Sequence, residues 1–183
     1  MTGTRKARTF AIKDAWIGAY NAGAAVTTWV EFPLVSDGTL ELSTEEATIL
    51  DGRGRRQATW KHSPAGRVTL RGGEGSMQIL EMVTGSGVSS YLNIDSMQFG
   101  TEAELTPPSV RLKLRADIKD SADNEGLQYV YCYKAIGQFP SIGMAQTTPG
   151  VVEIPFSLNS DTKDHTGATV ASAYGRLDFY YTP

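Results

Sequence analysis

The sequence predicts a mainly β fold: two packed antiparallel sheets, sandwich-like or barrel-like, flanked by one short α-helix. Three observations support this prediction. Apolar and polar residues alternate with a period of two in several segments, glycine-rich or polar turns separate these segments, and a single segment has helical spacing. Strands before and after one short helix are typical of an antiparallel β domain with a helix packed on it.

The second half of the chain has the clearest strand pattern. Residues 110–119 alternate without a break between apolar and charged side chains, as expected of a strand with one buried face. Residues 127–136 are aromatic and β-branched on both sides, so both faces are expected to be covered. The polar stretch between these segments predicts a hairpin with a longer loop.

Two further strands are predicted towards the end of the sequence. Residues 152–158 alternate in the same way, although Pro155 favours an edge strand or a bulge because proline has no backbone N–H to donate. Leu177, Phe179 and Tyr181 repeat the period of two in the closing stretch GRLDFYYTP and predict a final strand.

The first half predicts two strands and a long hairpin. Residues 10–16 and 27–32 are candidate strands joined by a stretch of small residues. Residues 39–50 begin with clean alternation, and a return strand follows across the glycine turn DGRGRR.

One helix is predicted after the glycine-rich stretch RGGEG. Ser76 is the candidate N-cap, because its hydroxyl can accept bonds from the first backbone N–H groups of a helix. Ile79, Leu80 and Val83 then form one apolar face, and Gly85 is the expected terminating residue.

Length and composition limit the possible functions. The 183 residues are enough for one domain with a sizeable core, and we expect a single domain over residues 1–183. There is no apolar run that could span a bilayer and no secretory signal, so synthesis in the cytoplasm without a membrane partner is the default expectation. A single cysteine cannot form an internal disulfide, and two histidines are too few for a Cys/His metal site. The pI of about 5.4 argues against a general nucleic-acid binder.

The charged residues change sign at one glycine turn. Between residues 37 and 52 every charged residue is acidic, whereas between residues 53 and 73 every charged residue is basic. One interpretation is that an acidic strand pairs locally with a basic strand. The sharper hypothesis is self-assembly, in which the acidic patch of one copy contacts the basic patch of the next copy.

No segment specifies an enzyme or a cofactor. The glycine-rich stretches lack the residue spacing of a phosphate-binding loop. His165 follows Asp164 in a polar region and is expected to be a solvated loop histidine, while His62 is expected to be exposed or to cap a strand end. Cys132 lies between two tyrosines and is expected to be a small buried core residue without nucleophilic function.

The order of the segments resembles a known family. Residues 30–86 contain a strand with an acidic stretch, a glycine-rich hairpin, a basic return strand and a short helix ending in VTG, and the chain closes with YGRLDFYY. This order is similar to that of the major tail tube proteins of long-tailed, siphophage-like bacteriophages, over roughly residues 10–183. The resemblance lies in the order of the segments and in the types of residue in each segment, and it includes no catalytic motif.

The resemblance implies a structural role in the virion. It implies a tail-tube fold of two packed sheets and a helix, in hexameric rings that stack head to tail into a hollow tube. The implied partners are further copies of the chain, a tape-measure protein and a tail-terminator protein. DNA would pass through the lumen during ejection without specific binding.

A lumen lined by carboxylates and hydroxyls suits this role. Each lysine or arginine that faced the passing DNA would gain binding free energy by releasing counterions. The candidate lumen-facing residues are Asp37, Glu41, Ser43 and Glu45. Leu40 and Leu42 alternate with them and are expected to point into the subunit.

The resemblance also implies that the hairpin tip, residues 51–57, protrudes and contacts the next ring. Its arginines would meet acidic groups there. The candidate inter-ring residues are Asp51, Arg53, Arg55 and Arg56. Residues 1–9 are expected to form a flexible N-terminal arm, and this arm and the polar loop KDSADNEG are further candidate contacts.

Other functions stay open on the sequence alone. A tail terminator or a head decoration protein would have a related fold and would differ in the number of copies per assembly. A carbohydrate-binding β-sandwich would present Trp16, Trp29, Trp60 or Tyr180 to sugar rings, although core packing is the commoner fate of such side chains. A hydrolase would need a catalytic constellation that the sequence does not specify.

Overall fold

The protein is mainly β, with one short helix among the residues that the structure describes. The structure is a computed structural model and describes residues 7–50, 56–72, 76–92, 94–98, 106–120, 125–143 and 151–181. The strands are β1 (Ala7–Ala19), β2 (Trp29–Phe32), β3 (Val35–Leu50), β4 (Arg56–Gly72), β5 (Val88–Tyr91), β6 (Ile94–Met97), β7 (Ser109–Asp120), β8 (Glu125–Gly137), β9 (Ser141–Gly143), β10 (Val151–Asn159), β11 (Asp161–Lys163), β12 (Thr169–Ala173) and β13 (Gly175–Tyr181). The helix α1 (Met77–Thr84) lies between β4 and β5. The predicted fold class is confirmed.

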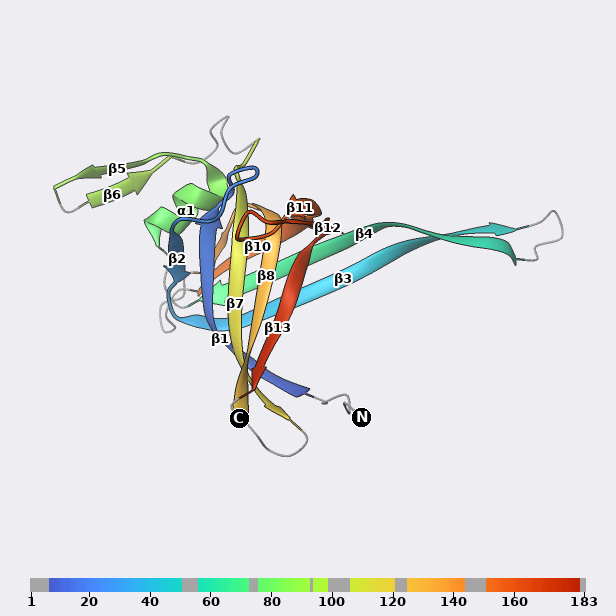
Figure 1. The fold of residues 1–183 in the computed structure, drawn as a ribbon. Coiled ribbons are helices and arrows are strands. Elements are labelled where there is room, and N and C mark those ends of the chain that lie inside the picture. Colours follow the sequence, from blue (N-terminus) through green and yellow to red (C-terminus); the bar gives the residue numbers. More distant parts are fainter. Residues whose placement is uncertain are drawn as a thin grey trace.

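Most strands belong to one antiparallel sheet that folds into two layers. Its order is β2-β1-β7-β8-β10-β4-β3, and β13 and β9 pair with β8 and β10. The layers separate at β8, because residues 126–132 of β8 pair with β13 whereas residues 134–137 pair with β10. Figure 1 shows β3 and β4 running across β1, β7, β8 and β13. The two predicted sheets are thus two layers of a sheet that is continuous through β8.

One hydrophobic core lies between the layers. The alternating apolar residues of β7 and β10 are all buried, and core residues also come from β1, β2, β4, β8 and the helix. β3 crosses β1 at Gly38, where an added Cβ would collide with the side chain of Ile12. The close crossing therefore requires a residue without a side chain.

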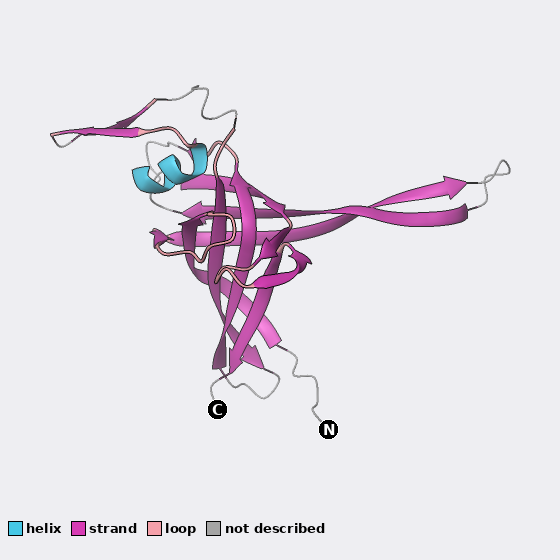
Figure 2. Ribbon diagram, turned by 45° about the horizontal axis from the view of Figure 1, so that its top comes forward, coloured by secondary structure: helices cyan, strands magenta, loops and turns pink. Residues whose placement is uncertain are grey.

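The predicted helix is present and ends as expected. Gly85 adopts a left-handed conformation (φ 75°) and its N–H donates to the Glu81 carbonyl at 2.8 Å. Ile79, Leu80 and Val83 are buried. Ser76 stands at the N-cap position, but its side chain makes no capping hydrogen bond, so that detail of the prediction is wrong. Figure 2 shows α1 beside one end of the sheet, next to the β5–β6 hairpin.

The sequence favours an edge strand or a bulge at Pro155, and of these two positions the sheet edge is wrong. β10 has β4 along one side, and β9 and then β8 along the other. Pro155 lies where the second neighbour changes from β9 to β8, and its carbonyl accepts a 2.8 Å hydrogen bond from the Gln138 backbone N–H. This interruption of the ladder accommodates proline inside the sheet.

Residues 7–9 belong to a strand, although the sequence suggests a flexible arm over residues 1–9. Ala7 pairs with Asp120 and Thr9 with Ile118 of β7. Residues 1–6 lie outside the described residues. The strand begins earlier than its pattern indicates because β7 is long enough to pair with it.

Arg111 is fully buried, whereas its position among the charged residues of β7 predicts a solvent-facing side chain. Its Nε donates to the Tyr133 carbonyl at 3.1 Å, and its Nη1 donates to the Ala24 carbonyl at 2.7 Å. Its Nη2 lies 3.9 Å from Oδ2 of Asp161. The connection between β1 and β2 covers this end of the sheet and buries the guanidinium.

Candidate functional site

The acidic and basic segments of the sequence lie side by side on one exposed face. The register of β3 and β4 places Asp37 opposite Arg71 and Glu41 opposite Arg67. Together with neighbouring residues of β10 they line a shallow depression of about 250 Å³, here called the polar ladder. Its residues are Asp37, Thr39, Glu41, Arg67, Thr69, Arg71 and Glu153. The interpretation that an acidic strand pairs locally with a basic strand is confirmed.

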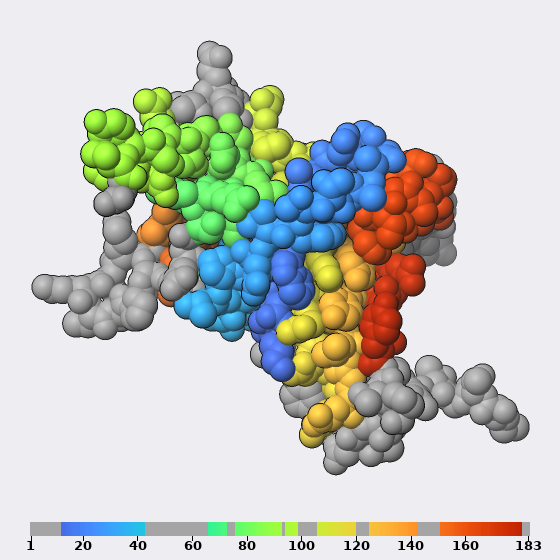
Figure 3. All heavy atoms as spheres, turned by 60° about the vertical axis from the view of Figure 1, so that its left-hand side comes forward, coloured from blue at the N-terminus to red at the C-terminus, as the bar shows by residue number. Residues whose placement is uncertain are grey.

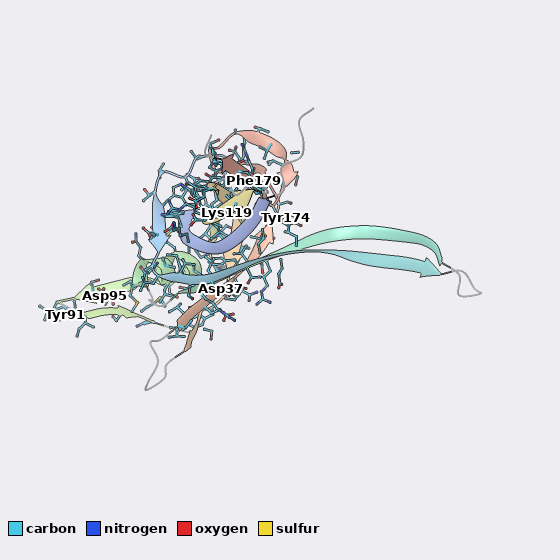
Figure 4. The ribbon with its side chains drawn as sticks, turned by 90° about the horizontal axis from the view of Figure 1, so that it is seen from below. Asp37, Tyr91, Asp95, Lys119, Tyr174 and Phe179 are labelled. Carbon is cyan, nitrogen blue, oxygen red and sulfur yellow. The ribbon has the colours of Figure 1, made fainter. Side chains whose placement is uncertain are left out.

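Charges within the polar ladder neutralise one another at short range. Arg71 Nε donates to Glu153 Oε2 at 2.8 Å, and this hydrogen bond, more than the carboxylate charge, raises the pKa of Arg71. Asp37 is labelled beside β3 in Figure 4, and its Oδ1 accepts a 2.7 Å hydrogen bond from the Gly38 backbone N–H. The ladder is exposed, so these pairs shape the surface potential more than they stabilise the fold.

Two of the four candidate lumen residues lie on the polar ladder. Asp37 and Glu41 are exposed on β3. Ser43 and Glu45 continue the same strand with their backbones opposite Ala65 and His62, and their side chains lie outside the described residues. β4 contributes two arginines to the same face, whereas the expected lumen surface is lined by carboxylates and hydroxyls.

The two leucines that alternate with these residues behave differently from each other. Leu40 is partly buried and packs against the core, as predicted. Leu42 lines the same pocket as Leu40 but is 64% exposed, so the burial expected from an inward orientation is absent. Leu42 stands at the opening between β10 and β13, where β8 changes its neighbour from one of these strands to the other.

The hairpin of β3 and β4 extends beyond the rest of the sheet and forms an arm. β10 pairs with β4 between Gly66 and Gly72, whereas among the described strands residues 43–50 and 56–65 pair with each other alone. At ~3.3 Å per residue, residues 56–65 span about 33 Å. Figures 1 and 2 show this arm projecting away from the body.

The tip of the arm is the part that the sequence assigns to contacts between rings. β3 ends at Leu50 and β4 begins at Arg56, and these two residues pair at the described end of the arm. Asp51, Arg53 and Arg55 lie outside the described residues. The sequence also did not indicate that β4 continues through Pro64, which pairs with Thr44 of β3 beside a shift in the register between the two strands.

An apolar groove opens where the two layers separate. It has a volume of about 260 Å³ and lies between β3 on one side and β8 and β13 on the other. Leu42 and Leu177 stand at it and are 64% and 49% exposed. The lining residues are Leu40, Leu42, Val130, Tyr131, Cys132, Leu158, Ala173, Tyr174, Gly175, Arg176 and Leu177. Sequence reasoning missed this groove because it depends on how the layers diverge.

A second exposed apolar feature is the tip of the β5–β6 hairpin. Tyr91, Leu92 and Ile94 are 76%, 86% and 67% exposed, and this group is here called the β5–β6 tip. The hairpin pairs only through its own two strands among those described. Apolar and polar residues do not alternate in SSYLNI, so no strand period in the sequence marks this hairpin.

The aromatic residues considered for sugar binding are partly covered. The Lys113 ammonium lies 4.8 Å from the Trp16 ring centroid and 5.2 Å from that of Tyr129. Tyr180 packs edge-on against Tyr129 with 5.6 Å between centroids. Trp29 is half-buried against Gly18, and the side chain of Trp60 lies outside the described residues. Cations thus occupy the ring face of Trp16 that a sugar would need.

Asp164 and His165 shape a turn rather than a catalytic pair. Asp164 Oδ1 accepts hydrogen bonds from the Thr166 hydroxyl (2.7 Å) and from the backbones of Thr166 and Ala168 (both 2.9 Å). Burial by itself would raise the pKa of Asp164, but these bonds lower it below its ordinary value. His165 lies in a loop, as expected, but its ring stacks on Tyr131 with 3.9 Å between centroids, so the expected solvation of the ring is wrong.

Cys132 is buried, as expected, and its burial raises the pKa of the thiol to about 12. A thiol with such a pKa is protonated at neutral pH and is a poor nucleophile. His62, for which the sequence suggests an exposed or capping position, has its backbone in β4, and its side chain lies outside the described residues.

Within the described ranges, no three His, Cys, Asp or Glu residues are grouped closely enough to hold a metal ion. The one described helix is too short to cross a membrane. Comparison with protein-family models and with curated proteins finds no match.

Proposed function

We propose that this protein is the tail tube subunit of a long-tailed bacteriophage. In this proposal it self-assembles into hexameric rings that stack into a tube, resides in the virion, and forms the conduit for DNA ejection. Its partners would be further copies of itself, a tape-measure protein and a tail terminator. The observation that supports the proposal best is the long β3–β4 arm.

The arm has physical properties that favour a partner. An isolated two-stranded hairpin is marginally stable in water, because it has no third strand and no core to pack on. Both of its edges present unpaired backbone groups that can add to another chain. A hairpin that extends about 33 Å beyond the sheet is therefore stabilised when a neighbouring copy packs against it.

The polar ladder suits a surface past which DNA moves. Phosphates bind most strongly to unpaired cations, since each contact releases counterions. Arg71 is bound to Glu153, and Arg67 lies opposite Glu41. These carboxylates offset the attraction that the two arginines would have for a phosphate.

Electron microscopy of a charge-reversal variant tests the proposal. Arg53→Glu, Arg55→Glu and Arg56→Glu together should leave single rings intact and shorten or abolish tubes, because the arm tips would no longer attract acidic groups on the next ring. A matched control reverses three cations on the body: Lys13→Glu, Lys134→Glu and Lys163→Glu. Tubes of wild-type length in the arm variant would contradict an inter-ring role of these arginines.

The same micrographs separate the alternatives. Wild-type assemblies that stop at one ring at every protein concentration would favour a tail terminator. A stable monomer that binds glycans would favour the carbohydrate-binding alternative, and a monomer that binds only to capsids would favour a head decoration protein.

A further inference from the structure

The β5–β6 tip concentrates apolar side chains at the end of a polar stem. In the stem, the hydroxyls of Ser89 and Ser96 are 2.8 Å apart, and the Ser90 hydroxyl donates to Asp95 Oδ1 at 2.5 Å. The three large apolar residues Tyr91, Leu92 and Ile94 follow at the tip and are mostly exposed. Water therefore contacts a compact apolar knob in the single chain.

The backbone conformation of Leu92 is also unfavourable in the single chain, in addition to the exposure of its side chain. Its φ is 55°, the left-handed region, where a side chain branched beyond Cβ is disfavoured and where Asn or Gly is usual in a tight hairpin turn. Both the backbone conformation and the 86% exposure of the side chain are unfavourable at this position.

The apolar groove has the size and the lining that such a knob requires. A cavity of about 150 Å³ lined by apolar side chains holds a benzene ring. The groove has about 260 Å³ and is lined mainly by leucine, valine and aromatic side chains. Leu42 and Leu177 remain exposed at it, so filling the groove removes apolar surface on both partners from water.

The β5–β6 tip and the apolar groove have side chains of opposite charge beside them. Asp95 lies next to the knob and is exposed. Arg176 lines the groove, and its side chain is exposed even though its Nε donates to Asp178 at 2.5 Å. A carboxylate beside the knob can thus approach a guanidinium beside the groove.

The knob and the groove lie on opposite sides of one chain. Figure 4 shows Tyr91 and Asp95 at one extremity and Tyr174, which lines the groove, on the far side of the body. Figure 3 shows β5–β6 and the C-terminal strands at opposite borders of the visible face. The hairpin of a chain cannot reach its own groove, so the partner must be another molecule.

We infer that the β5–β6 tip of one copy inserts into the apolar groove of the next copy, with Asp95 near Arg176. The inference deepens the proposed self-assembly and rests on it. The contact joins two different surfaces, so it is head to tail and generates a closed ring when the rotation between copies closes. It is separate from the arm, which would connect one ring to another.

Cross-linking tests the contact itself. Ser90→Cys places a thiol beside the knob and Ala173→Cys places one in the groove, and neither change removes an apolar tip residue. With a short bis-maleimide, the double variant should give a ladder of covalent oligomers, whereas each single variant should give dimers at most. The native Cys132 adds little background because its thiol is buried with a pKa of about 12.

A pair of matched substitutions tests the energetics. Leu92→Asn removes the knob residue, and Leu34→Asn changes another leucine with a positive φ (46°) and 66% exposure, remote from the tip. Both variants should melt at or above the wild-type temperature, because asparagine tolerates this conformation. Leu92→Asn should raise the protein concentration needed for assembly by about tenfold or more, whereas Leu34→Asn should not change it.

The outcomes separate this inference from the proposed function. Tubes of the wild-type protein without a ladder from the double variant would overturn the inference and leave the tube proposal standing. A ladder that never develops into tubes would support the contact and count against a tube. The absence of both ladder and assembly would overturn both.

Discussion

At the scale of single residues, Arg111 fixes the β1–β2 connection to the sheet. Its guanidinium donates to the carbonyls of Ala24 and Tyr133 and lies 3.9 Å from Asp161, while the Tyr20 ring centroid lies 5.2 Å from Cζ. One buried cation thus joins a loop, a neighbouring strand and the start of β11. Replacing a buried charge that has these partners lowers the free energy of unfolding.

We predict that Arg111→Met lowers the free energy of unfolding by about 3–5 kcal/mol, because Asp161 then loses its cation and two carbonyls lose their donor. Urea unfolding of the purified variant measures this loss. The double variant with Asp161→Asn should recover part of the stability. A loss below about 1 kcal/mol for Arg111→Met would show that the pair matters little.

His165 predicts a pH dependence of stability. Burial against Tyr131 lowers the pKa of His165 below its ordinary 6.5, although the nearby Asp164 carboxylate opposes the shift. A histidine whose pKa is lower in the folded state stabilises the fold above its ordinary pKa, and this contribution is lost as the pH falls through 6.5 towards the folded value.

The melting temperature should therefore fall between pH 7 and pH 5. His165→Phe keeps a ring on Tyr131 and removes the titrating group, so its melting temperature should fall less over the same range. Thermal melts followed by circular dichroism measure both slopes. Equal slopes for the variant and the wild type would assign the pH dependence to other groups.

At the scale of elements, the arm is separable from the body. Residues 44–64 lie beyond the part of β4 that pairs with β10. Replacing them with Asn-Gly should connect Ser43 to Ala65 through a two-residue hairpin turn, since these two residues already face each other. The shortened protein should keep its melting temperature within a few degrees, and a large decrease would show that the arm stabilises the body.

The strands and the helix were predictable because their periodicity is local. In β7 and β10 every second residue faces the core, and in α1 one side of the helix does so. The apolar residues therefore recur at fixed spacings that can be read within each segment. The β5–β6 and β11–β12 hairpins were missed, since their short strands are largely exposed and have no apolar face to mark them. Continuation of β4 through Pro64 was missed because this part of the arm has no third strand that would need the proline N–H.

At the scale of the whole molecule, positions that depend on the relation between layers could not be predicted. Arg111 and Leu42 alternate correctly in sequence, yet one is buried by a loop and the other is exposed where the layers diverge. The pairing of acidic β3 with basic β4 was predictable, since the sign change occurs at the hairpin turn. The groove emerges only when distant segments are placed in space, because its lining comes from residues 40, 42, 130–132, 158 and 173–177.

The arrangement of surfaces on the molecule indicates two kinds of contact between copies. The arm projects from one side, and the knob and the groove lie on two other parts of the body. Contacts through knob and groove would close a ring, and contacts through the arm would add rings to one another. Loss of the arm should therefore affect stacking and spare the ring.

Whether the arm joins one ring to the next can be measured by negative-stain electron microscopy of the wild-type protein and the arm-deleted variant, with light scattering on the same samples. We expect hollow tubes of uniform width from the wild type and single rings of the same diameter from the variant. Tubes from the variant, or a wild-type protein that remains monomeric at every concentration and salt condition, would contradict this role of the arm.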